Sequence, residues 1–136
     1  MTDASFGAVV LGVDGAGEVE DKEKAVVEGQ TATCWAAISP ATGTRFVTDV
    51  ARNRLVEVAV RNGVGVLGEI DLSANGDKGL IDLAAGGELV YALSPGDNET
   101  EAAVTVVNVW TRKMVQHAKL SGVGANGNAM GMALVF

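Results

Sequence analysis

The sequence predicts an all-β protein made of β-propeller blades, four-stranded antiparallel meanders that form an incomplete ring in this chain. Residues 34–60 contain three short runs separated by tight links, of which the first is apolar and the two later ones are dominated by β-branched residues, which favours strands over helices. A similar unit recurs over residues 79–110, and a fourth run follows each unit, at 66–72 and 114–120. Four strands in about 45 residues is the period of a propeller blade.

The first full blade is predicted from its turns and its alternation. Pro40 to Gly43 form the first link, since proline presets φ and glycine tolerates the positive φ that often closes such a turn. The second run covers 46–50, and residues 51–54 form the second link. Residues 55–60 then alternate as a strand does.

The second full blade repeats this order with a longer loop. Residues 79–84 precede a glycine turn at 85–87, and residues 88–93 precede a loop that contains Pro95 and a polar insertion at 97–101. The predicted strands lie near residues 6–13, 34–39, 45–50, 55–61, 66–72, 79–84, 88–93, 103–110, 114–120 and 129–135.

The two ends of the sequence predict partial blades. Residues 1–5 are polar and expected to be loose, whereas 6–13 fit the third strand of a blade. Residues 18–27 carry mixed charge and fit an outer edge strand that faces water; a short helix over 19–27 is the alternative, since Glu, Lys and Ala favour helix. Residues 1–136 therefore form a single partial domain: a half blade (about 6–27), two blades (34–72 and 79–120) and a terminal inner strand (128–136).

The segments CWAAISPATGTRFVTD and IDLAAGGELVYAL, each followed by a Val-rich run, resemble blades of the lactonase-like β-propellers, which include 6-phosphogluconolactonases and fungal 3-carboxymuconate cyclases. The resemblance covers nearly the whole chain. It implies a ligand site at the mouth of a central channel. The lactone-processing members use His, Glu and Arg groups there, but no local motif in this sequence matches those positions. No catalytic residue is therefore assigned, and whether the chain is an enzyme stays open.

Composition excludes some classes of partner. The chain has 136 residues, a formal net charge of −7 and a pI of about 4.5, which disfavours nucleic acids and anionic membranes, because both need a cationic face. The single cysteine, Cys34, is expected to be a buried, inert thiol. No signal peptide or membrane span is predicted. The compartment stays open: secretion from a longer precursor would make the glycosylation sequon at Asn98 relevant.

Motifs for cofactors and metals are weak. Two glycine patterns, at 63–68 and 122–127, match the dinucleotide fingerprint but lack the strand–helix context that phosphate binding requires. No cofactor is predicted. The only histidine, His117, is expected to face solvent or pack, because no partner lies near it in sequence. Asp71, Asn75 and Asp77 are spaced unlike a calcium loop and are ordinary turn residues, so no metal is predicted.

Loops that join outer to inner strands, and second to third strands, ring the channel mouth of a propeller. Basic residues there could bind carboxylates or phosphates, although solvated turn residues are the more general explanation. Both tryptophans are expected to pack between blades, and a place on the cavity wall is the alternative for Trp35. The candidate binding residues are Trp35, Arg52, Asn53, Arg54, Asp77, Lys78, Asn126 and Asn128.

The functional expectation is a non-catalytic or ligand-binding homologue that assembles with further blades, from a second copy or from a companion chain. Two copies would supply about six blades, within the range of four to eight that propellers use. A small anionic ligand is the expected small-molecule partner. The alternative is part of an active lactonase or muconate cycloisomerase acting on small lactones or carboxylates.

Overall fold

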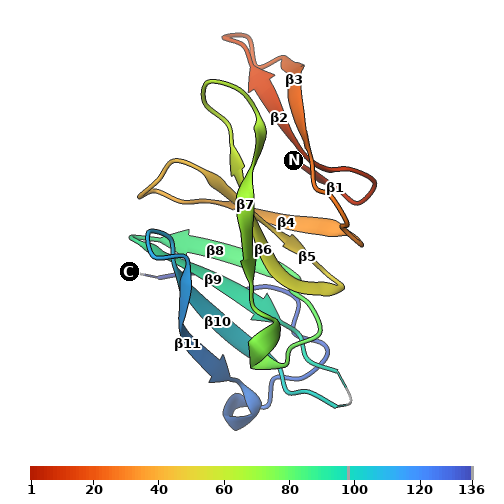
Figure 1. Cartoon of the computed structure of the whole chain (residues 1–136), viewed down its shortest axis with the longest axis vertical. Helices are drawn as coiled ribbons and strands as arrows, with labels where there is room; N and C mark the ends of the chain where they lie inside the picture. The colour runs from red at the N-terminus through yellow and green to blue at the C-terminus, as the bar shows by residue number, and fades with distance from the viewer. Residues whose placement is uncertain (98, 136) are drawn as a thin grey trace.

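The computed structural model describes residues 1–97 and 99–135, which fold into three antiparallel sheets. The first sheet has three strands and the other two have four each, in sequence order across each sheet. Figure 1 shows the sheets stacked one after another along the chain. The strands are β1 (Thr2–Asp3), β2 (Gly7–Val13), β3 (Val19–Val26), β4 (Thr33–Ile38), β5 (Arg45–Asp49), β6 (Arg52–Ala59), β7 (Gly65–Asp71), β8 (Asp82–Gly86), β9 (Leu89–Ser94), β10 (Ala103–Asn108) and β11 (Lys113–Lys119).

The predicted fold class is therefore confirmed. The described residues are all-β with propeller-like blades, and they close no ring. Two single turns of 3-10 helix, η1 (Ser73–Asn75) and η2 (Ser121–Val123), begin the loops after β7 and β11. The edge strand β3 replaces the helix that was the alternative for residues 19–27.

One backbone contact recurs in all three sheets, where it extends the ladder of the outermost strand by one more pair. The residue that follows this strand donates its N–H to a carbonyl just before the neighbouring strand or near its start. These bonds run from Val27 to Phe6 (2.8 Å), from Leu72 to Asn53 (2.9 Å) and from Leu120 to Ala102 (2.8 Å).

Two apolar layers hold the sheets together. The alternation of β5 sends Phe46 to one face of the second sheet and Val47 to the other. Phe46 and Leu55 pack with Val90 and Val107 of the third sheet. Val47 belongs to the layer shared with the first sheet. A sheet that is apolar on both faces must be covered on both, so the middle sheet has a packed neighbour on each side.

Several strand limits differ from the predicted ones. Residues 1–5, expected to be loose, contain β1, which pairs with β2. Arg52 to Arg54, expected in a link, begin β6. β8 begins at Asp82 rather than 79, since Leu80 first donates its N–H to the Asp49 carbonyl of the second sheet. β10 ends at Asn108, because the next residues turn the chain toward β11.

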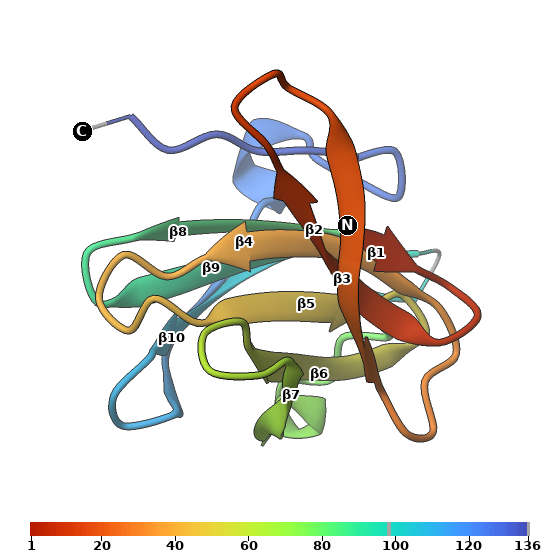
Figure 2. The ribbon, with the colours of Figure 1, turned by 90° about the horizontal axis from the view of Figure 1, so that it is seen from above.

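The terminal inner strand predicted near 129–135 does not form. The described part of this segment is irregular and runs beside β8, as Figure 2 shows. Its contact with the third sheet includes a 2.6 Å hydrogen bond from the Met132 N–H to Asp82 Oδ2. A strand requires a ladder partner, and no described strand pairs with this segment. Phe136 lies outside the described residues.

The prediction of a buried Cys34 is wrong, and so is the packing expected of both tryptophans. Cys34 is exposed, and the side chains of Trp35 and Trp110 are 44% and 59% exposed. Cys34 and Trp35 lie on β4, the edge strand of the second sheet. The pairing of β4 with β5 is irregular between Thr33 and Ala36. An edge strand is covered only where a neighbouring element reaches it. Trp110 lies in the turn after β10 rather than inside a strand.

Candidate functional site

One end of the stacked sheets gathers most of the predicted site residues. The connections after β5, β7 and β9 and the segment after β11 leave their sheets at this end, the lower end in Figure 1, because alternate connections of an antiparallel meander lie on the same side. We call it the loop end. Six of the eight predicted residues line three pockets at this end, and Lys78 and Trp35 line none of the three. The six are Arg52, Asn53, Arg54, Asp77, Asn126 and Asn128.

Lys78 lies beside Asp77 in the sequence but does not form a wall of these pockets. Its ammonium group instead reaches the second pocket through a 3.1 Å ion pair with Glu99, which lines that pocket. Both side chains of this pair are largely exposed, and exposed pairs contribute little stability. Lys78 is therefore a cation at the loop end that is free to exchange partners.

The first pocket, about 440 Å³, is built around Arg54. Arg54 is buried, and its guanidinium group lies 3.3 Å from Asp49 and 2.6 Å from Glu69. It also donates to the carbonyl of Glu28 (3.1 Å). Asp49 and Glu69 belong to the second sheet, and Glu28 belongs to the link that enters it from the first sheet. Arg54 therefore connects the second sheet to that link. Its role is structural, and it is not a solvated turn residue.

Asp49 is the buried carboxylate beneath this pocket. Its oxygens accept hydrogen bonds from the N–H groups of Thr31 (3.0 Å), Ala32 (3.2 Å) and Ala51 (3.3 Å). Burial raises the pKa of this carboxyl, but the three N–H groups and the Arg54 guanidinium lower it by more, so the pKa lies below its ordinary value of 3.8. Asp49 is therefore ionised at neutral pH and fixes the link that enters the second sheet.

Arg52 and Asn53 differ in how much of the side chain a ligand can reach. Arg52 is exposed and donates to the carbonyl of Gly29 (2.5 Å). Asn53 is buried, and its amide donates to the carbonyls of Leu72 (3.0 Å) and Asp77 (3.1 Å). Arg52 is thus the accessible cation of this pocket, whereas Asn53 shapes the loop after β7.

Two atoms beside this pocket have unused hydrogen-bonding capacity. Asn53 Oδ1, an acceptor, and Arg54 Nε, a donor, are buried without a hydrogen-bond partner among the described residues. Buried polar atoms are usually paired.

The second pocket, about 420 Å³, contains a histidine–carboxylate pair. His117 Nε2 lies 3.2 Å from both oxygens of Asp77, and the two side chains are 18% and 4% exposed. His117 was expected to face solvent or pack, and this partner is distant in sequence. The residues are 40 positions apart, and they meet because β11 ends beside the loop that follows β7. The carboxylate orients the imidazole, an arrangement that general bases also use.

The third pocket, about 550 Å³, contains both predicted asparagines. The side chain of Asn126 accepts the N–H of Asn128 at 3.0 Å, a local turn that shapes its own backbone. Asp97 on the facing wall accepts the N–H groups of Glu99 and Thr100, both at 2.7 Å. Hydrogen bonds from these two backbone N–H groups lower the pKa of the Asp97 carboxyl, so this wall is anionic at neutral pH.

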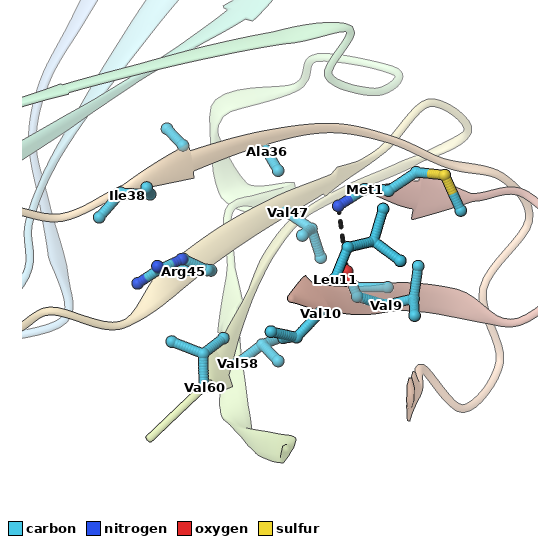
Figure 3. Close-up of a pocket in the computed structure, with 12 residues that line it drawn as sticks. Met1, Val9, Val10, Leu11, Ala36, Ile38, Arg45, Val47, Val58 and Val60 are labelled. Carbon is cyan, nitrogen blue, oxygen red and sulfur yellow. Dashed lines mark hydrogen bonds between the residues drawn. The ribbon is translucent and has the colours of Figure 1, made fainter. Parts of the chain in front are cut away.

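A fourth feature lies away from the loop end, between the first and second sheets. Figure 3 shows an apolar groove, about 330 Å³ in volume, beside β2. Val9, Val10 and Leu11 form one wall, and Ile38 and Val58 belong to the facing sheet. No sequence pattern pointed to it, because its walls come from strands that only the packing of the two sheets brings together.

No group of three or more His, Cys, Asp or Glu side chains in 1–97 and 99–135 is placed to hold a metal ion. Asp71 ends β7, and its carboxylate accepts the N–H of Ser73 (2.9 Å). Asn75 and Asp77 follow in the loop after this strand. No described helix is long and apolar enough to cross a membrane. The sequon at Asn98 lies outside the described residues.

Comparison with known proteins identified no relative. No family model, no curated protein and no solved structure matches this chain. The repetition of the three sheets is observed in the structure. The resemblance to lactonase-like propellers rests on the sequence pattern alone and remains a proposal.

Proposed function

We propose that this chain is a segment of a lactonase-like β-propeller that assembles with further blades and binds a small molecule without turning it over. The repetition of antiparallel sheets with strands in sequence order supports the proposal, because propeller blades are four-stranded sheets repeated along the chain. Propellers use about four to eight blades, and the described residues supply one partial and two full ones. Blades from a second copy or a companion chain would complete a ring.

The loop end is the proposed ligand site. Arg52 and Lys78 are its accessible cations, and a carboxylate or phosphate of a small anionic ligand would pair with them. Arg54 is already neutralised by Asp49 and Glu69, so it positions the loops instead of contacting ligand. Asp77, Asn126 and Asn128 would add hydrogen bonds from the neighbouring pockets. Trp35 is proposed to add an aromatic contact from the exposed edge strand β4.

Assembly is tested by the mass of the particle in solution. We expect size-exclusion chromatography with light scattering to give an oligomer for the full chain. A chain truncated after Asn126 should dissociate or aggregate, because it loses the apolar terminal segment. A soluble monomer at the same concentrations, unchanged by truncation, would contradict the proposed assembly.

A catalytic alternative is favoured by one observation, the pair of His117 and Asp77. On this alternative the chain is part of a lactonase or muconate cycloisomerase, with the oriented imidazole as its base. We expect no turnover of sugar lactones or muconates by the isolated chain, because general acid–base groups typically contribute about 10²–10⁴-fold to rate and the carboxylate nearest to His117, that of Asp77, serves to orient the imidazole. Turnover that is lost in His117→Ala and kept in the exposed neighbour variant Gln116→Ala would establish the enzyme instead.

A further inference from the structure

The first sheet has an unpaired strand edge. β1 pairs with β2 only through Thr2 with Ala8 and Asp3 with Gly7, and Met1 adds two backbone hydrogen bonds with Val9, at 2.9 and 3.0 Å. Beyond Val9, no strand among the described residues lies on this side of β2. Because ladder bonding alternates along a strand, Leu11 and Val13 direct their N–H and C=O groups toward this open edge.

The apolar groove lies beside the same edge. Its walls include Leu11 of β2 and, on the second sheet, Ile38 of β4 and Val60 after β6, as Figure 3 shows. Ile38 is 58% exposed, and Arg45 is the charged side chain on the wall. An open edge beside an apolar groove is the surface that an added strand recognises: main-chain bonds hold its backbone, and alternate side chains enter the groove.

We propose that this groove binds residues 128–135 of a second copy of the chain, as a strand added to β2. The inference rests on the proposed assembly and names the segment that makes the contact. In an extended strand, alternate residues share a face. Met130, Met132 and Leu134 would then share one face with Asn128, and the other face would hold the small residues Ala129, Gly131 and Ala133 together with Val135. The face with the methionines matches an apolar groove, and the segment carries no charge.

The position of the segment points to a second copy as its source. The segment lies beside β8 of the third sheet, whereas the groove lies between the first and second sheets. The second sheet separates the first from the third, since each of its faces packs against one of them. Within the segment, Met130 and Val135 are 68% and 93% exposed, and no described strand pairs with it. Reciprocal exchange between two copies would cover both features.

Photo-crosslinking in the full chain tests this contact. Benzoylphenylalanine is placed at Ile38, and the protein is mixed with a copy labelled with heavy nitrogen. We expect a crosslink from Ile38 to the tryptic peptide of residues 120–136 of the other copy. The same probe at Leu67, an exposed residue of β7 that does not line the groove, is the matched control and should not label that peptide.

A substitution gives an independent measurement. Ile38→Arg should raise the dissociation constant of the oligomer by about tenfold or more, which corresponds to about 1.4 kcal/mol, whereas Leu67→Arg should leave it unchanged. Far-ultraviolet circular dichroism checks that both variants fold. An oligomer that crosslinks elsewhere, or that Ile38→Arg leaves intact, would overturn the strand exchange and leave the proposed assembly standing. A monomeric full chain would overturn both.

Discussion

Arg54→Ala is expected to lower the free energy of unfolding by about 3–5 kcal/mol, because it leaves a buried carboxylate without its charge partner. Arg54 lies 3.3 Å from Asp49, and the two side chains are 6% and 1% exposed. The substitution also removes the hydrogen bond to the Glu28 carbonyl, so the link between the first two sheets should loosen. Urea unfolding followed by circular dichroism, at one fixed chain concentration, measures the change.

Arg52→Ala is the matched control for this prediction. Arg52 is the same residue type two positions away, but it is exposed and its side chain donates a hydrogen bond to the Gly29 carbonyl. Its loss should cost about 1 kcal/mol or less. Equal effects of the two substitutions would show that burial of the Arg54–Asp49 pair does not matter to stability.

The same carboxylate predicts a dependence of stability on pH. The pKa of Asp49 is lowered in the folded chain, from 3.8, by its backbone donors and Arg54 despite the opposing effect of burial. A carboxyl with a lowered folded pKa stabilises the fold above its unfolded pKa, and this contribution is lost as pH falls through the folded value. Stability should therefore decrease below about pH 4. Asp49→Asn should weaken this part of the dependence, and an unchanged acid profile would contradict it.

Gly79→Ala is expected to destabilise the fold by about 3 kcal/mol, the upper part of the usual range for overpacking. A Cβ atom at Gly79 would lie 2.0 Å from the carbonyl oxygen of Val50 and 2.5 Å from its carbon. These are backbone atoms of the turn between β5 and β6, so no flexible side chain can move aside. The chain that enters the third sheet must pass this close to the second, and only glycine permits it.

Gly65→Ala is the control for this glycine. A Cβ atom at Gly65 meets no atom within 4 Å, and its φ is not positive. The free energy of unfolding should change by about 0.5 kcal/mol or less. Thermal or urea unfolding measures the free energy of unfolding of both variants. If Gly79→Ala left this free energy unchanged, the chain at Gly79 would not pass as close to Val50 as the structure shows.

The sequence by itself determined the fold class and most strands. Alternation of β-branched residues in β6, the Pro40 to Gly43 turn and the recurrence of the unit near Gly87 are local signals. A strand is recognisable from them because its side chains alternate between two faces wherever the sheet lies. The link predicted at residues 51–54 is in fact Val50 and Ala51, and β6 begins at Arg52, since a turn residue and a strand residue can share composition.

Only the tertiary structure decided which residues meet. His117 and Asp77 pair across 40 positions, Arg54 pairs with Asp49 rather than solvent, and Gly79 passes against Val50. Cys34 is exposed despite its apolar surroundings in sequence. The physical reason is that alternation states which residues share a face, but not what covers that face. Burial, ion pairing and close approach depend on the neighbouring sheet. The terminal segment forms no strand because no described strand pairs with it.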